Sequence, residues 1–148
     1  MTDHMQTAIT QAKEAASRDE VPVGAVLINT KTGEVIAVAS NRCEELNDPS
    51  AHAEMLVLRE ACTAQKTTRL PDYDLYVTLE PCAMCAAMIS NTRIRRLYYG
   101  AYDPKSGGVE HGAKVFDHTT THHKPEIYGG IMEAECATLM TDFFKSKR

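Results

Sequence analysis

The sequence lacks any long apolar run. Its apolar stretches, such as residues 25–28 and 82–89, are far shorter than the roughly 20 residues that a helix needs to cross a bilayer. The first six residues contain no basic segment followed by an apolar one, so no secretory leader is evident. We therefore expect a protein of the cytoplasm that makes no use of a membrane.

The chain also lacks a positive net charge, which is formally −4, and it lacks internal repeats, low-complexity segments and linkers. Its 148 residues have the length of one ordinary domain, so we expect residues 1–148 to form a single domain. A composition of 43% hydrophobic and 24% charged residues excludes the disordered and fibrous classes. The negative charge argues only weakly against a nucleic-acid partner, because binding needs no more than a local basic face.

Helices and strands are expected to alternate along the chain. Apolar residues at helical spacing predict helices over residues 3–17, 81–91 and 132–145, and a further helix that begins at Asp48-Pro49-Ser50, where Asp48 would act as the cap. Short apolar segments predict strands over residues 23–28, 35–39, 75–78, 97–99 and 126–128. This alternation indicates an α/β sandwich in which helices cover a sheet.

His52, Cys82 and Cys85 form a candidate ligand set for a metal ion. The two cysteines are three residues apart at the start of a predicted helix, so their side chains share one face. The positive end of a helix dipole lowers the pKa of a thiol there and favours the metal-binding thiolate. His52 opens its own helix, and two sulfurs with one nitrogen favour zinc.

The number of ligands separates the two kinds of zinc site. Structural sites are closed by four protein ligands, whereas catalytic sites keep one position for water. Among the five cysteines, Cys62 lies about 15 Å along the helix from His52 and is too far away, and Cys136 is interpreted as a core residue. Cys43, in a loop near the site, is the one candidate for a fourth ligand, and whether it approaches the metal stays open. Three ligands and one water are the preferred interpretation.

Glu54 follows His52 by two residues in the first turn of the predicted helix. Its carboxylate is expected not to bind the metal but to take a proton from water on the metal and pass it to the substrate. His-Ala-Glu alone is almost uninformative, and a lone CxxC is more often redox or structural. His52-Ala53-Glu54 followed 30 residues later by Pro-Cys-x-x-Cys, however, matches the signature of zinc deaminases of nucleobases.

The chain resembles the bacterial tRNA-specific adenosine deaminases, which are members of the cytidine deaminase-like superfamily. The resemblance covers nearly the whole chain. The whole superfamily shares the His-Ala-Glu and Pro-Cys-x-x-Cys segments. The Asp103-Pro-Lys-Ser-Gly-Gly loop and the Asp142-Phe-Phe ending are more specific to the tRNA enzymes. Further matching segments are residues 21–26, 48–54, 76–85, 99–108 and 130–144.

This resemblance implies a cytidine deaminase-like three-layer α/β/α sandwich with a five-stranded mixed sheet. It implies a homodimer in which both subunits shape the RNA site. It also implies one zinc ion per subunit, held by His52, Cys82 and Cys85, with Glu54 as the proton shuttle.

The resemblance further implies a set of substrate-binding residues. Asn41 would hydrogen-bond the base or its sugar, Val23 would form an apolar wall, and Asp103 would contact the flipped nucleotide. The set is completed by Ala53 and by residues of the surrounding RNA surface, Lys105, His123 and Phe144. Two groups of basic residues have two equally good interpretations, as RNA contacts or as solvated helix ends. They are Arg93, Arg95 and Arg96, and Lys145, Lys147 and Arg148.

The implied reaction is the zinc-dependent hydrolytic deamination of adenosine to inosine at the wobble position of a tRNA anticodon loop. Water would attack C6 of adenine while Glu54 protonates N1, and ammonia would leave. One alternative is an enzyme of the same superfamily that acts on guanine, cytosine or a nucleotide. The Asp103-Pro-Lys-Ser-Gly-Gly segment and the C-terminal helix argue against this alternative. The other is a non-enzymatic zinc module that binds RNA. A purely structural site, however, has no use for Glu54.

Overall fold

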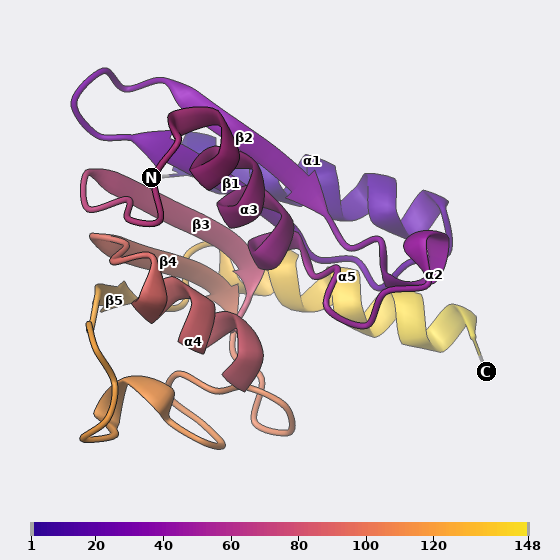
Figure 1. Cartoon of the computed structure of the whole chain (residues 1–148). Helices are drawn as coiled ribbons and strands as arrows, with labels where there is room; N and C mark the ends of the chain where they lie inside the picture. Colours follow the sequence, from indigo (N-terminus) through magenta and orange to yellow (C-terminus); the bar gives the residue numbers. More distant parts are fainter. Residues whose placement is uncertain (1, 148) are drawn as a thin grey trace.

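The computed structural model describes residues 2–147 and has three layers, with a sheet in the middle (Figure 1). Helices α1 (Thr2–Ser17) and α5 (Glu133–Ser146) cover one face of the sheet, and α3 (Ala53–Gln65) and α4 (Ala83–Asn91) cover the other. The predicted α/β/α sandwich is therefore confirmed. Among residues 2–147, no helix combines the length and the apolar character that crossing a membrane requires.

The sheet is five-stranded and mixed, as predicted, with the order β2-β1-β3-β4-β5. Strand β1 runs antiparallel to β2 and β3, whereas β4 runs parallel to both β3 and β5. The strands are β1 (Gly24–Asn29), β2 (Val35–Ser40), β3 (Tyr73–Leu79), β4 (Arg96–Ala101) and β5 (Glu126–Tyr128). Because β3 and β4 are parallel, the segments that follow their carboxyl ends emerge at the same edge of the sheet.

Side chains of the central strands alternate between two apolar cores. Leu75 and Leu97 are buried under α3 and α4, whereas Tyr76 and Tyr98 are buried on the side of α1 and α5. The rings of these two tyrosines stack with their centroids 4.4 Å apart. Burial on both faces explains why apolar or aromatic side chains occupy five of the seven positions of β3.

The segment between β2 and α3 differs from its prediction. Asp48 does not cap α3, because its carboxylate accepts hydrogen bonds from the N–H and the hydroxyl of Ser50, at 2.8 and 2.7 Å, and closes a local turn. A short helix, α2 (Cys43–Leu46), precedes this turn. The buried carboxylate of Glu20 accepts the N–H groups of Glu44 and Glu45, at 3.2 and 2.7 Å, and so caps α2 from a distant part of the chain.

Two helices begin slightly later than their sequences predict. Helix α3 begins at Ala53 and α4 begins at Ala83, so that His52 and Cys82 occupy the extended cap positions that precede them. Both side chains therefore project from the chain just before a helix rather than from its first turn. This placement lets two separate helix starts present ligands at one point.

Close packing of α1 on β1 generates a prediction about stability. A Cβ atom at Gly24 would lie 2.0 Å from the carbonyl oxygen of Ala8 and 2.7 Å from the nitrogen of Ala12, both in the backbone of α1. We expect Gly24→Ala to lower the free energy of unfolding by about 3 kcal/mol, because the helix must move off the strand. Urea denaturation followed by circular dichroism measures this change.

Gly33→Ala is the matched control. Gly33 has a φ of +77° and open space around it, so the same substitution should cost only about 1 kcal/mol of backbone strain. Equal losses in the two variants would contradict the role given to the contact between α1 and β1.

Candidate metal and substrate site

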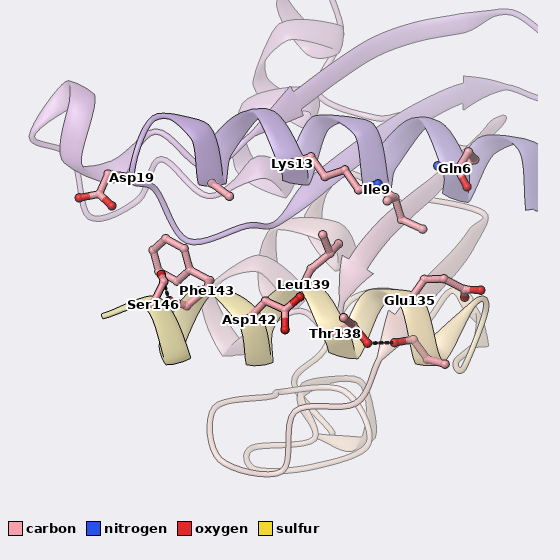
Figure 2. A pocket seen from close by; sticks show the side chains of 12 residues that line it. Gln6, Ile9, Lys13, Asp19, Glu135, Thr138, Leu139, Asp142, Phe143 and Ser146 are labelled. Carbon is pink, nitrogen blue, oxygen red and sulfur yellow. Dashed lines mark hydrogen bonds between the residues drawn. The ribbon is translucent and has the colours of Figure 1, made fainter. Parts of the chain in front are cut away.

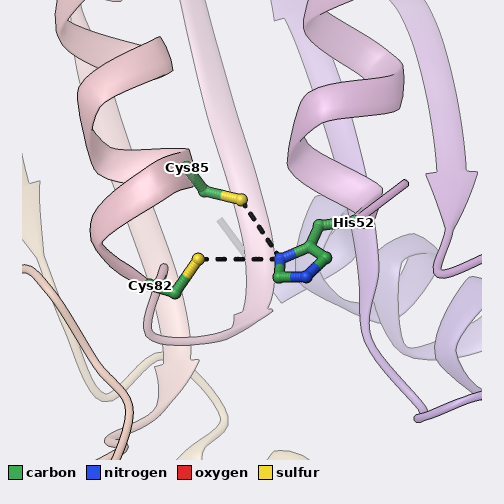
Figure 3. Close-up of side chains that lie close together, drawn as sticks. All are labelled: His52, Cys82 and Cys85. Carbon is green, nitrogen blue, oxygen red and sulfur yellow. Dashed lines mark hydrogen bonds between the residues drawn. The ribbon is translucent and has the colours of Figure 1, made fainter. Parts of the chain in front are cut away.

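His52, Cys82 and Cys85 meet at the edge of the sheet where β3 ends (Figure 3). Nδ1 of His52 lies 3.6 Å from Sγ of Cys82 and 3.4 Å from Sγ of Cys85. One ligand atom from each residue lies within 4.8 Å of the other two. The structure therefore brings together the three residues that the sequence predicts as metal ligands, in an arrangement compact enough to surround one ion.

The two thiols of the cluster hold their protons unequally. A hydrogen bond with Cys85 is the main cause that lowers the pKa of Cys82 to about 4. Burial opposes this shift, and His52 adds to it. The same contact with Cys82, together with burial, raises the pKa of Cys85 well above its usual value. The lowered pKa of Cys82 favours the thiolate, which is the metal-binding form, and a bound cation deprotonates a coordinating thiol outright.

Glu54 lies beside this cluster as the second residue of α3. Its side chain is buried, and burial raises its pKa to about 7. Within residues 2–147, its Oε1 atom has no hydrogen-bond partner. Buried polar atoms in native proteins nearly always have a partner, so this oxygen is available to a reacting group that enters the site.

The donor set fits a zinc ion in a catalytic role. Two sulfurs and one imidazole nitrogen are ligands that zinc accepts, and three protein ligands leave a fourth position for water or substrate. In the described part of the chain, no further His, Cys or carboxylate joins the cluster. Cys43 lines the neighbouring cavity, but its Sγ lies 4.0 Å from the carbonyl oxygen of Pro49 and stays outside the ligand group.

A cavity of about 790 Å³ opens beside the cluster. Most of the residues that the sequence predicts for the site line it: Val23, Asn41, His52, Glu54, Cys82, Asp103, Lys105 and Phe144. Cys85 is buried within the ligand group, and Ala53 is buried at the start of α3. Met140 of α5, which the sequence does not single out for the site, contributes to one wall.

Asn41 is fixed at the cavity wall by three contacts. Its Oδ1 accepts the N–H of Ala53 at 2.8 Å, its own N–H donates to the carbonyl of Val23 at 3.1 Å, and Arg18 donates to its carbonyl at 3.2 Å. Because the side-chain oxygen is used by Ala53, the amide NH2 group remains to donate to a ligand. Arg18 was not predicted, since it acts from the end of α1 and no local pattern marks it.

Asp103 lies in a turn at the mouth of the cavity. Its Oδ1 accepts the N–H groups of Lys105 and Ser106, at 3.2 and 3.0 Å, and its own N–H donates to Oε1 of Glu80 at 3.0 Å. Glu80 is buried and lines the cavity, and sequence reasoning missed it. The available signal was an acidic residue directly after an apolar strand and directly before Pro81-Cys82.

The structure does not bring His123 to the cavity. Its Nε2 lies 2.8 Å from the carbonyl oxygen of Ile94, and its N–H donates to Oγ of Ser90 at 3.0 Å. Ser90 lies in the last turn of α4 and Ile94 lies between α4 and β4, at the opposite edge of the sheet. The reason is topological. Because β5 is parallel to β4, the chain must return to the amino ends of the strands before β5 begins.

The predicted arginine group lies at that opposite edge as well. Arg95 binds both carboxylate oxygens of Asp74, at 2.9 and 2.7 Å, and Nε of Arg96 lies 2.7 Å from Oε2 of Glu126. These guanidinium groups are paired within the chain rather than directed at the cavity. Of the C-terminal group, Lys147 does line the cavity and forms an ion pair with Asp19, and Arg148 lies outside the described residues.

A second groove, of about 700 Å³, runs between α1 and α5 (Figure 2). Its floor includes apolar side chains such as Ile9 and Leu139, and Lys13 and Asp142 are among its charged residues. Within the part of the chain that the structure describes, no His or Cys lines this groove. The groups suited to chemistry therefore gather in the cavity beside the cysteines.

Comparisons with known proteins agree with this geometry. The profile of the MafB19-like deaminases matches residues 1–148. The tRNA-specific adenosine deaminase of Agrobacterium fabrum (strain C58) is 55% identical over 147 residues, which cover 99% of this chain and 95% of that protein. The chain belongs to the tRNA-specific adenosine deaminase family. The resemblance seen in the sequence is thereby confirmed.

Solved structures extend the comparison of this deaminase to three dimensions. A structure from studies of A-to-I editing by tRNA:A34 deaminases at the wobble position of transfer RNA is 55% identical with a TM-score of 0.91, and the match covers 94% of this chain and 99% of that one. A guanine deaminase from Bacillus subtilis is 35% identical with a TM-score of 0.64, covering 68% of this chain and 63% of that one. The deaminase fold is thus shared with enzymes named for different substrates.

The cluster predicts how this deaminase binds metal. We expect the purified protein to hold one zinc ion per chain, and Cys82→Ala or Cys85→Ala to weaken zinc affinity by at least about 100-fold, because each removes a direct ligand. Elemental analysis after dialysis and titration against a chromophoric chelator measure both quantities. Cys62→Ala, on α3 and outside the cluster, is the matched control and should retain the ion. A loss of zinc in Cys62→Ala equal to that in Cys85→Ala would contradict the assignment.

Proposed function

We propose that the protein is a zinc-dependent deaminase that converts adenosine to inosine at the wobble position of a tRNA anticodon loop. The observation that carries the proposal is the convergence of His52, Cys82 and Cys85 beside the unpaired, buried oxygen of Glu54 at one cavity. Membership of the tRNA-specific adenosine deaminase family supports the choice of substrate. The cytoplasm, where tRNA is modified in a bacterial cell, is the proposed location.

The proposed reaction replaces the amino group on C6 of adenine by an oxygen taken from water. When bound by His52, Cys82 and Cys85, a zinc ion supplies Lewis acidity that makes water nucleophilic near neutral pH. Glu54 takes a proton from the attacking water and delivers it to N1 of the base. Glu54 then takes the remaining proton of the hydroxyl newly attached to C6 and gives it to the amino group. The C6–N bond breaks, ammonia leaves, and the oxygen on C6 becomes a carbonyl. These transfers need one carboxylate within reach of both water and base. The buried side chain of Glu54 beside the cluster, with one oxygen unpaired among residues 2–147, supports giving it this role.

Asn41 and Val23 are proposed to orient the base. The NH2 group of Asn41 is left to donate after its oxygen binds Ala53, so it suits an acceptor on the base or its sugar. Val23 is buried and gives the cavity an apolar wall against which a flat base can pack. Together they hold the reacting ring in one orientation, which is a large part of what an active site contributes.

The rim of the cavity supports an RNA substrate rather than a free base. A base must leave its stack to reach the site, and this costs least in a single-stranded loop. Lys105 lines the cavity and can meet a phosphate beside the extracted base. Phe144 is 46% exposed at the same cavity, where its ring can stack on a neighbouring base.

A free-base deaminase is the second candidate. It is supported by the likeness to the guanine deaminase from Bacillus subtilis, since the same cluster would perform the same hydrolysis. A small base gains most from full enclosure, however, and an exposed aromatic side chain at the cavity mouth has little to contact on such a substrate. The rim therefore favours the larger substrate.

A homodimer is also part of the proposal. Two large apolar side chains, Leu46 and Met84, are 51% and 37% exposed. Leu46 lies in the same short helix as the cavity-lining Cys43, and Met84 lies between the two cysteine ligands. A second subunit that covered them would border the substrate site. Light scattering on the purified protein should give twice the mass of one chain.

The decisive variant is Glu54→Ala. We expect it to lower the rate of inosine formation by about 100- to 10,000-fold, because the proton shuttle is lost, while zinc content and melting temperature stay unchanged. The substrate is an anticodon stem-loop with adenosine at the wobble position, and nucleoside mass spectrometry detects inosine. Glu60→Ala, an exposed position on the same helix, is the matched control and should retain activity.

Three other results would each contradict one part of the proposed function. Loss of zinc in Glu54→Ala would contradict the shuttle role. Absence of inosine with the unaltered protein, together with ammonia release from guanine or cytosine, would favour the free-base enzyme. Zinc and RNA binding without deamination of any of these substrates would leave a non-enzymatic module.

A further inference from the structure

Glu80 is a buried carboxylate at the carboxyl end of β3, and only 2% of it is exposed. Its Oε1 accepts the N–H of Asp103 at 3.0 Å and lies 2.8 Å from Nδ1 of His111. Its Oε2 accepts three backbone N–H groups, those of residues 109, 110 and 111, at 3.2, 2.9 and 3.0 Å. A single side chain therefore binds both the beginning and the end of the loop formed by residues 103–111, which we call the Asp103 loop.

Two glycines allow the Asp103 loop to reach this carboxylate. A Cβ atom at Gly107 would lie 2.6 Å from Cδ and Oε2 of Glu80, and one at Gly108 would lie 2.5 Å from the nitrogen of Ala83. The N–H of Gly108 also donates to the carbonyl of Pro81 at 2.8 Å. The loop thus packs directly on the backbone that carries the candidate ligand Cys82.

The donors around Glu80 require a carboxylate. All the contacts come from N–H groups, and an ionised carboxylate only accepts. A glutamine would turn an NH2 group toward some of these donors and leave them unpaired. Burying a charge is also an expensive way to stabilise a fold, because a well-packed apolar group of similar size often does as well. A buried charge that holds both ends of one loop therefore indicates that its role is to fix the geometry of that loop.

We propose that Glu80 is a positioning residue, which fixes the Asp103 loop relative to Cys82 so that Asp103 and Lys105 meet the RNA beside the reacting base. This inference rests on the proposed tRNA substrate. Glu80 sits two residues before Cys82 and contacts Asp103. It therefore links the candidate metal site to the nucleotide-binding rim. It acts through the loop and has no part in the proton transfers.

The test compares Glu80→Gln with the unaltered protein on the wobble-adenosine stem-loop, well below both melting temperatures. We expect KM to rise about tenfold, since several hydrogen bonds to a charged group are lost and the rim is displaced. We expect kcat to fall less than about threefold and zinc to remain at one ion per chain, because His52, Cys82, Cys85 and Glu54 are unchanged. Glu126→Gln makes the same chemical change at an exposed, paired carboxylate and should leave KM unaltered.

Hydrogen exchange gives a readout that does not depend on activity. In Glu80→Gln, the amides of residues 103 and 109–111 should exchange about ten times faster or more, because their acceptor is weakened. The amides of β3 should exchange at the original rate. Equal protection of the loop in both proteins would show that Glu80 does not anchor it and would overturn the proposal.

A second variant keeps the test decisive if Glu80→Gln fails to fold. The side chain of His111 is partly exposed, and His111→Ala removes one of the hydrogen-bond donors to Glu80. We expect KM to rise about threefold at unchanged kcat. An unchanged KM in the folded variant, or a fall in kcat accompanied by loss of zinc, would overturn the positioning role. Failure of the unaltered protein to form inosine would refute the proposed function. Normal inosine formation by the unaltered protein, together with an unchanged KM in Glu80→Gln, would refute only the positioning role of Glu80.

Discussion

The parallel pairing of β3 and β4 is the constraint on which the site depends. Their carboxyl ends are adjacent, with Leu79 opposite Ala101, so the segments that follow them must share one edge of the sheet. One segment leads into α4 and carries the two cysteines, and the other carries Asp103. Helix α3 begins at the same edge and adds His52 and Glu54. The candidate metal cluster and the turn at Asp103 are neighbours because β3 and β4 run in the same direction.

Buried polar groups in this site fall into two kinds. Asn41 and Glu80 have their acceptors satisfied by backbone N–H groups, and each holds a loop or a helix start in place. Glu54 differs, because one of its oxygens is buried without a partner among residues 2–147. Native proteins tolerate such an atom where a reaction needs it. The contrast separates groups that hold the site together from Glu54, whose unpaired oxygen suits the proposed role in proton transfer.

The alternation of helices and strands and the metal cluster could be predicted from the sequence because their signals are local, whereas the five-stranded mixed sheet was implied by the family resemblance. Short apolar strands, helical spacing, and the His-Ala-Glu and Pro-Cys-x-x-Cys motifs each occupy a few consecutive residues. Arg18, Glu20 and Glu80 were missed because their partners lie more than 20 residues away. The cap at Asp48 was wrong because its carboxylate serves its own turn. His123 was misplaced because only the parallel pairing of β5 shows where its loop returns.

The cavity draws its reactive groups and its rim from different parts of the chain. The cysteines, His52 and Glu54 come from the starts of α3 and α4, whereas much of the rim comes from α5 and the Asp103 loop. Neither rim segment supplies a member of the cluster. The rim can therefore differ between related chains while the candidate metal cluster stays the same. This separation offers a physical reason why one architecture is shared by tRNA:A34 deaminases and a guanine deaminase.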